Sequence, residues 1–154
     1  MKQFKGRPVV AGKCIAPALV SHGGFNTLAS FQGALQFGDL PVIGGKYKQT
    51  ECDDQNNKDL YRKPMLGKAL CLPQTIGSTT GGMILFTANV MGKCPACLLF
   101  SEHIDSLAAA GAALSAVWSE SPMPVVDCLG QEFLDTVKDG DMITVGADGT
   151  VTVG

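Results

Sequence analysis

One unit of the sequence, residues 67–92, constrains the fold more than any other. Residues 67–73 form a short apolar run bounded by a glycine and a proline, which predicts a buried strand. After a brief turn, the hydroxyl side chains of residues 78–80 precede the uninterrupted run 81–91, and Gly92 follows it. Hydroxyl side chains are common helix caps and glycine commonly ends a helix, so the pattern predicts a strand followed directly by a helix. This order is typical of α/β proteins.

The same alternation continues toward the C-terminus. It predicts a strand, a helix, a further strand and a short helix over residues 93–100, 104–118, 123–128 and 133–137. In the longer of these helices, one i, i+4, i+7 track is formed by Leu107, Gly111, Leu114 and Trp118. The many alanines around this track would allow close packing of the helix against its neighbours.

The two ends of the chain have the pattern of antiparallel strands. Residues 7–21 are rich in β-branched side chains and punctuated by glycine and proline, which predicts two short strands. Residues 142–153 alternate apolar and polar side chains around Asp148 and Gly149, a strong hairpin signal. With 154 residues and 45% hydrophobic content, we expect one α/β domain over residues 1–154.

Two segments near the middle are less regular. Residues 23–39 carry phenylalanine and leucine at mixed spacing and predict a helical turn or two. Residues 41–64 are rich in Gly, Lys, Asp, Gln and Asn, offer no evident apolar face, and predict a long exposed loop. Loops of this length are usually mobile or functional, so the segment is a candidate flap over an active site, and the exposure of its Cys52 is of particular interest.

The charge pattern and the remaining composition exclude several classes of function. The formal net charge is −2 and no run of Lys or Arg occurs, so neither nucleic acid nor an anionic membrane is an expected partner. No stretch has the roughly 18 apolar residues of a membrane-spanning helix, and the first residues do not resemble a signal peptide. We therefore expect a cytoplasmic protein.

The six cysteines are expected to be free thiols, because cysteine packs as a small apolar residue in a reducing compartment. Cys94 and Cys97 form a C-x-x-C motif, but they precede a predicted strand, whereas a thioredoxin-like thiol needs a helix N-terminus. A zinc site would need a second cluster, and none occurs. Packing is the favoured interpretation, with thiol redox through this pair as an alternative.

Other side chains with chemical potential are scattered. His22 and His103 have no catalytic partner in the sequence, and local hydrogen bonding is the simpler interpretation for both. The acidic residues show no metal-ligand spacing. Asp127 ends an apolar strand and is the one carboxylate that suggests a functional or interface role.

The turn at residues 76–82 is the strongest candidate site. Glycines allow a tight turn, while the unpaired N–H groups and positive dipole end of the following helix favour an anion or a developing alkoxide. Ser78 at this place could act as a nucleophile or a base. The alternative is that it only caps the helix.

At this point the sequence resembles a known family, the swivel domain or small subunit of aconitase X enzymes. The order and spacing of five segments carry the resemblance: residues 67–73, 77–79, 92–97, 111–114 and 124–126. Residues 6–20 and 140–153 also resemble that family, so the likeness covers most of the chain. Small residues such as alanine normally fill the family's positions that match Cys94 and Cys97, which agrees with the packing interpretation.

The resemblance implies a swivelling β/β/α domain that docks on a large catalytic subunit carrying an iron–sulfur cluster. It implies a hydro-lyase that removes water from a small hydroxy acid, with Ser78 as the general base. On this basis we expect Gly77, Thr79 and Thr80 to bind the substrate, and no metal ligand on this chain.

The sequence also departs from the family. Thr75 and Ile76 stand where the family commonly has a basic residue and a glycine, and the segment 23–53 differs, so its role in substrate recognition does not transfer. Because a phosphoryl group usually draws Arg or Lys, this departure favours cis-3-hydroxy-L-proline as substrate, with mevalonate 5-phosphate as the alternative. A non-catalytic binding or regulatory swivel module is the alternative from another class.

Overall fold

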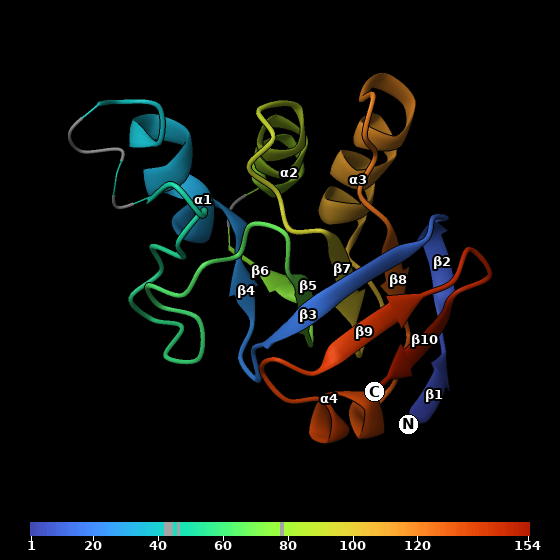
Figure 1. Ribbon diagram of the computed structural model, residues 1–154. Coiled ribbons are helices and arrows are strands. Elements are labelled where there is room, and N and C mark those ends of the chain that lie inside the picture. The colour runs from blue at the N-terminus through green and yellow to red at the C-terminus, as the bar shows by residue number, and fades with distance from the viewer. Residues whose placement is uncertain (42–44, 46, 78) are drawn as a thin grey trace.

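The strand β3 (Cys14–Val20) belongs to both halves of an eight-stranded sheet. The structure is a computed structural model that describes residues 1–41, 45, 47–77 and 79–154, so the predicted catalytic Ser78 lies outside the described residues. Figure 1 shows the arrangement of the elements. The helices are α1 (Thr27–Phe37), α2 (Gly81–Val90), α3 (Ser106–Trp118) and α4 (Gln131–Thr136). The other strands are β1 (Lys2–Lys5), β2 (Arg7–Val10), β4 (Phe25–Asn26), β5 (Ala69–Leu72), β6 (Thr75–Ile76), β7 (Cys97–Phe100), β8 (Val125–Asp127), β9 (Met142–Val145) and β10 (Thr150–Val153).

The order of strands across the sheet is β1-β10-β9-β3-β5-β7-β8-β2. β3, β5, β7 and β8 are parallel because helical crossovers connect β5 to β7 and β7 to β8, as the alternating pattern predicted. β1, β9 and β10 are antiparallel, as is β2 on the other edge. The edge strands β1 and β2 are separated only by Gly6, so the sheet curls until its two edges meet there. A Cβ on Gly6 would lie 2.5 Å from the carbonyl oxygen of Asp127.

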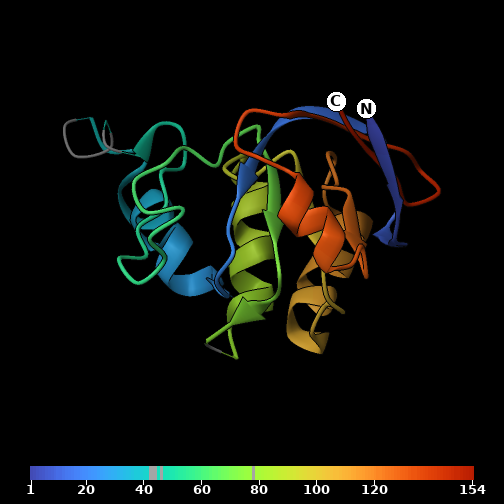
Figure 2. The same ribbon diagram turned by 90° about the horizontal axis from the view of Figure 1, so that it is seen from below.

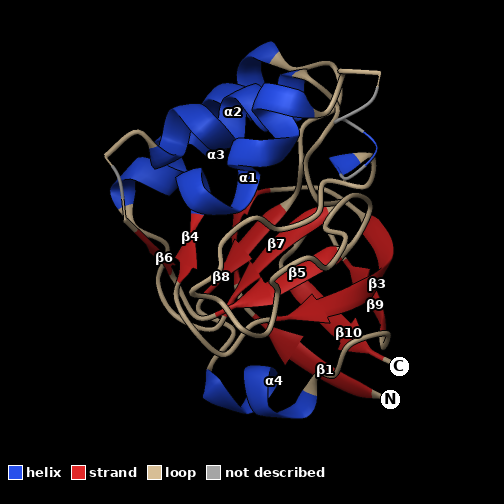
Figure 3. Cartoon of the chain, turned by 90° about the vertical axis from the view of Figure 1, so that its left-hand side faces the viewer, coloured by secondary structure: helices blue, strands red, loops and turns tan. Residues whose placement is uncertain are grey.

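The central strands are buried on both faces, and successive side chains enter two different cores. Leu70 and Leu98 enter a core beneath α1, α2 and α3, while Cys71 and Leu99 enter a second core with the antiparallel strands and α4. Figure 3 shows α1 to α3 on one side of the strands and α4 on the other. Because a strand alternates its side chains, one apolar run serves both cores. The expected β/β/α architecture is confirmed.

The helix pair α2 and α3 packs through two glycines. A Cβ on Gly82 would lie 2.3 Å from the carbonyl oxygen of Leu107, and one on Gly111 would lie 2.1 Å from the carbonyl oxygen of Gly82. The predicted track on α3 is therefore only partly right. Gly111 is buried, but Leu107 and Trp118 are 42% and 69% exposed. The buried face is made of small residues: Ala108, Gly111, Ala112 and Ser115.

The described part of residues 41–64 contradicts the prediction of an exposed loop without a buried face. Cys52 and Leu60 are completely buried, as is Met65 just after the segment. These apolar residues are separated by polar ones and follow no helical or strand period, so no sequence pattern indicated their burial. The segment forms turns and two isolated bridges, Glu51 with Pro64 and Cys52 with Tyr61.

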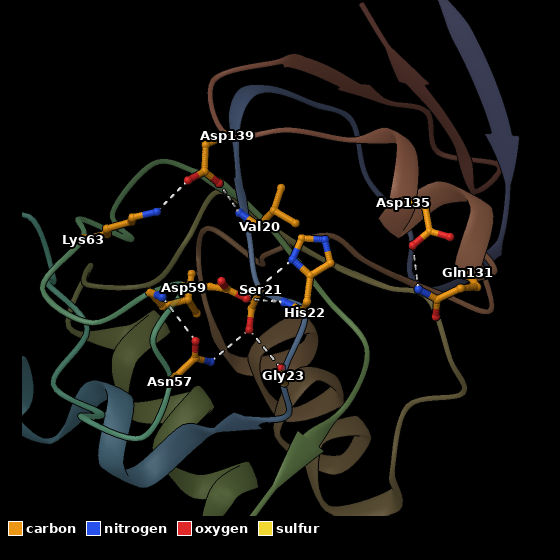
Figure 4. A network of polar contacts seen from close by, with 11 residues as sticks. Val20, Ser21, His22, Gly23, Asn57, Asp59, Lys63, Gln131, Asp135 and Asp139 are labelled. Atoms are coloured by element: carbon orange, nitrogen blue, oxygen red, sulfur yellow. Dashed lines mark hydrogen bonds and ion pairs between the residues drawn. The ribbon is translucent and has the colours of Figure 1, made fainter.

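Polar contacts anchor this segment beside the end of β3 (Figure 4). The side-chain amide of Asn57 donates to the hydroxyl of Ser21 over 2.9 Å, within the buried interior. The backbone N–H of His22 donates to the carboxylate of Asp59 over 2.8 Å. Lys63 pairs with the carboxylate of Asp139. The same carboxylate also accepts a hydrogen bond from the backbone N–H of Val20. The segment is thus fixed at several points.

The remaining differences from the predicted elements are local. The turn or two predicted in residues 23–39 is an eleven-residue helix, α1. β7 begins at Cys97 and not at residue 93, because Pro95 cannot donate to a strand pairing. Several predicted elements are confirmed: the two N-terminal strands, which are β2 and β3, the helices α2, α3 and α4, and the C-terminal hairpin. Figure 2 shows the two chain ends side by side, where β1 pairs with β10. None of the described helices is long and apolar enough to cross a membrane.

Candidate active site

The turn before residue 78 is held by a small parallel ladder. β6 pairs with β4, so that Ile76 lies opposite Asn26. Gly77 follows with φ of +98°, a conformation that favours glycine, and a Cβ there would lie 2.7 Å from the side-chain nitrogen of Asn26. The same Asn26 caps α1, because its side-chain oxygen accepts from the N–H of Ala29 over 3.1 Å. The cap of one helix therefore supports the turn that leads into the next.

A hollow of about 250 Å³ opens beside this turn. Its lining consists of Thr27, Thr75, Ile76, Gly77, Gly81, Asp105, Leu107 and Ala108. Thr27 and Gly81 are the first residues of α1 and α2, and Leu107 is in the first turn of α3. Three helix N-termini therefore face one space. Each carries partial positive charge, and none of the three first turns contains an acidic residue.

Asp105 ties the turn to α3. One oxygen of its carboxylate accepts from the N–H groups of Leu107 and Ala108, both over 3.0 Å, and so caps the helix. Its other oxygen accepts from the hydroxyl of Thr75 on β6. Asp105 therefore both starts α3 and links it to the turn.

The predicted site residues are only partly gathered at the hollow. Gly77 lines it, whereas Thr79 and Thr80 are exposed and are not part of its lining. Of the hydroxyl side chains at residues 78–80 that were predicted to cap α2, that of Thr80 makes no capping hydrogen bond to the helix. Thr27 and Asp105 also line the hollow but were not predicted as site residues. Asn26 directly before an apolar run was an available signal for a helix start at Thr27.

Asp127 lies away from the hollow and has a structural environment. Its completely buried carboxylate accepts from the guanidinium of Arg7 over 2.7 and 3.0 Å and from the N–H of Ile104 over 2.8 Å. Burial favours the protonated acid, but these hydrogen bonds outweigh it and hold the pKa of Asp127 below its ordinary value. His103 contacts the same Arg7. This cluster joins β2 and β8 to the start of α3.

The two cysteines of the C-x-x-C motif do not act as a pair. The Cys94 thiol is near Asn89, whereas the Cys97 thiol is within hydrogen-bonding reach of Cys14. Burial raises the pKa of Cys94, and the contact with Cys14 together with burial raises that of Cys97. Thioredoxin-like chemistry requires a lowered thiol pKa, so the packing interpretation is the better one for this motif. All six cysteines are free.

Comparison with known proteins shows the family to which the chain belongs. The aconitase X swivel domain family matches residues 3–153, and the chain belongs to this family. The chain is 31% identical over 151 residues to the phosphomevalonate dehydratase small subunit of Methanocella arvoryzae, covering 98% of this chain and 96% of that protein. It is 26% identical to the small subunit of the same name from Aeropyrum pernix, over 98% of this chain and 92% of that protein.

Two solved structures have the same fold. The crystal structure of Thermococcus kodakaraensis aconitase X in its holo-form superposes with a TM-score of 0.76 at 24% identity, covering 100% of this chain and 99% of that one. The solution structure of a UPF0107 protein superposes with a TM-score of 0.70 at 21% identity, over 99% of both chains. The expected family, fold and hydro-lyase class are therefore confirmed.

Proposed function

We propose that this chain is the small subunit of a phosphomevalonate dehydratase, in which it supplies a base to a site completed by a large subunit. The observation that carries the proposal is the hollow beside Gly77, into which the first turns of three helices open. The first turns of α1 and α2 carry partial positive charge, whereas the carboxylate of Asp105 offsets that of α3, so the side of the hollow formed by α1 and α2 suits an anionic group of a substrate. The expected cytoplasmic location stays a prediction.

Ser78 is the proposed base. In this proposal its deprotonated hydroxyl takes the proton from the carbon next to the substrate carboxylate, while hydroxide leaves the neighbouring carbon. A double bond forms between these two carbons, and the removed proton and the hydroxide together amount to one molecule of water. Gly77 turns the backbone into this position with its φ of +98°. Backbone N–H groups at the start of α2 would hold the carboxylate and stabilise the negative charge that develops on it. Substrate binding by Thr79 and Thr80 stays part of this proposal.

The choice of mevalonate 5-phosphate over cis-3-hydroxy-L-proline rests on two points. The relatives from Methanocella arvoryzae and Aeropyrum pernix are named for phosphomevalonate. The missing basic residue before Gly77 was the reason to favour hydroxyproline, and the convergence of three helix N-termini weakens that reason. Helix dipoles and free N–H groups bind phosphate or carboxylate without Lys or Arg.

The iron–sulfur cluster is proposed to belong to the large subunit. Among residues 1–41, 45, 47–77 and 79–154, no three His, Cys, Asp or Glu side chains gather as a metal site. The described part of this chain therefore offers no ligand set for a cluster. The roles proposed for this chain are to bind the substrate's anionic groups, to orient the turn and to move one proton.

The test is turnover by the co-expressed complex, prepared without oxygen, of the native chain, of Ser78→Ala and of a matched control. Ser121→Ala makes the same change at an exposed position beyond the C-terminal end of α3. We expect native and control complexes to dehydrate mevalonate 5-phosphate and Ser78→Ala to lose about 10²- to 10⁴-fold in kcat, the usual contribution of a general base. Gel filtration should show that all three assemble.

Three results would contradict the proposal in different ways. Undiminished turnover by an assembled Ser78→Ala complex would remove the base from Ser78. Turnover of cis-3-hydroxy-L-proline with none of mevalonate 5-phosphate would keep the hydro-lyase and reject the substrate. A chain that forms no complex with a large subunit would favour the binding or regulatory module instead.

A further inference from the structure

Thr27 occupies an unusual position for a hydroxyl side chain. It is the first residue of α1 and is only 2% exposed, yet it lines the hollow. The cap of α1 is already provided by Asn26, whose side chain accepts from Ala29. The hydroxyl of Thr27 has no hydrogen-bond partner in the part of the chain that the structure describes. Because Thr27 lines the hollow, its hydroxyl is available to a ligand there.

The start of α2 lies beside this hydroxyl. The hydroxyl oxygen of Thr27 lies 3.7 Å from where a Cβ on Gly81 would be. Among the described residues, no side chain caps α2 in the way that Asn26 and Asp105 cap α1 and α3. The first N–H groups of any helix have no acceptor within the helix, and in α2 these belong to Gly81, Gly82 and Met83. Such N–H groups favour an anion.

The acidic group nearest to these donors does not satisfy them. Asp105 also lines the hollow, but its carboxylate accepts from Leu107, from Ala108 and from the hydroxyl of Thr75. Its oxygens therefore serve α3 and β6. The donors that remain for a ligand belong to Thr27 and to the first turn of α2.

We propose that Thr27, together with the N–H groups of the first turn of α2, binds one oxyanion group of the substrate. The proposal rests on the proposed function and assigns to α1 a substrate contact some fifty positions before Ser78 in the chain. The ligand class is a phosphate or a carboxylate, because both present several acceptor oxygens to converging donors. Gly81 keeps open the space between the hydroxyl and the helix start.

Thr27→Val tests the contact, because it preserves shape and removes the hydroxyl. In the co-expressed complex, loss of a hydrogen bond to a charged group should raise KM about 10- to 100-fold while kcat changes little, and Thr27→Ser should restore KM. Thr87→Val is the matched control. Its hydroxyl donates to the carbonyl of Met83 over 2.8 Å on the exposed face of α2, so KM should not change. An unchanged KM in Thr27→Val would overturn the proposal.

A second measurement does not depend on turnover. Inorganic phosphate and acetate are titrated separately into the ¹⁵N-labelled full chain, and the amide signals of Gly81, Gly82 and Met83 are followed. Saturable shifts that Thr27→Val weakens and Thr87→Val keeps would support the proposal even if the native complex failed to turn over mevalonate 5-phosphate. Saturation by phosphate alone would assign the site to the substrate's phosphate, and saturation by acetate to its carboxylate. No saturable shift with either anion would overturn the proposal.

Discussion

Asp127 shows how one buried charge can be used for structure and not for chemistry. Both of its oxygens accept hydrogen bonds, from Arg7 on β2 and from Ile104 ahead of α3. The guanidinium side chain of Arg7 is 53% exposed, while the carboxylate is fully buried. Only one member of the pair is thus removed from water, which limits the desolvation cost. The carboxylate joins three elements that are distant in the sequence.

We predict that Asp127→Asn lowers the free energy of unfolding at pH 7 by about 1–3 kcal/mol, because it weakens bonds to a buried acceptor. The pKa of Asp127 is lowered in the folded chain. The stability from the charged form is therefore complete above the unfolded pKa of about 3.9, and is lost as the pH falls through the lower folded value. Urea unfolding from pH 7 to pH 3 should show a smaller loss in acid for the variant than for the native chain.

A control separates this effect from removal of any surface charge. Asp135→Asn alters an exposed carboxylate that accepts only from Gln131 on the same short helix. It should leave the free energy of unfolding at pH 7 within about 0.5 kcal/mol of the native value. Equal effects of the two substitutions would show that the Asp127 cluster has no special role in stability.

The helices α2 and α3 depend on each other for their positions. Gly82 and Gly111 let the two backbones approach until an added methyl group on either would overlap the other. This contact sets α2 so that Gly81 faces the hollow. The sequence identified Gly111 on a track of α3, but a glycine in a helix does not by itself show which helix it contacts.

Gly111→Ala should destabilise the protein although alanine favours helix by about 1 kcal/mol. Its Cβ would lie 2.1 Å from the carbonyl oxygen of Gly82, a backbone atom that cannot rotate away. We expect a net loss of about 1–3 kcal/mol in the free energy of unfolding, measured by urea denaturation. Gly81→Ala, whose Cβ would meet only Thr27 at 3.7 Å, is the control and should fold with nearly native stability. A Gly111→Ala chain more stable than native would refute the close contact.

The two cores of the molecule share the same strands. Leu98 and Leu99 are adjacent on β7, and each is at most 1% exposed, but the first contacts the helix-side core and the second the core of the antiparallel strands. Neither core can lose β7 without exposing the other. The protein is therefore expected to unfold in one cooperative step.

Leu99→Ala tests this cooperativity. It should lower the free energy of unfolding by about 2–5 kcal/mol, as cavities in cores do. Trp118, the single tryptophan, is on α3 in the other layer and contacts Phe86 on α2. The urea midpoint of its fluorescence should shift as far as the midpoint of far-ultraviolet circular dichroism. A fluorescence midpoint that stays in place while the dichroism midpoint shifts would show that the layers unfold separately.

The sequence by itself determined the order of strands and helices from residue 67 onward apart from the short strand β6, the C-terminal hairpin, the glycine stop at Gly92 and the candidate turn at residues 76–82. These features depend on neighbours along the chain: side-chain period, caps and turn-forming residues. A local pattern can therefore reveal them. The family resemblance used the same local segments.

The tertiary structure alone decided which residues meet. It brought Thr27 and Asp105 to the turn at Gly77, and it buried Cys52 and Leu60 within a segment that looked polar. Such contacts join residues far apart in sequence, and their energy comes from packing and burial between segments. The periodic pattern of a segment does not show which distant segment it will contact in the fold.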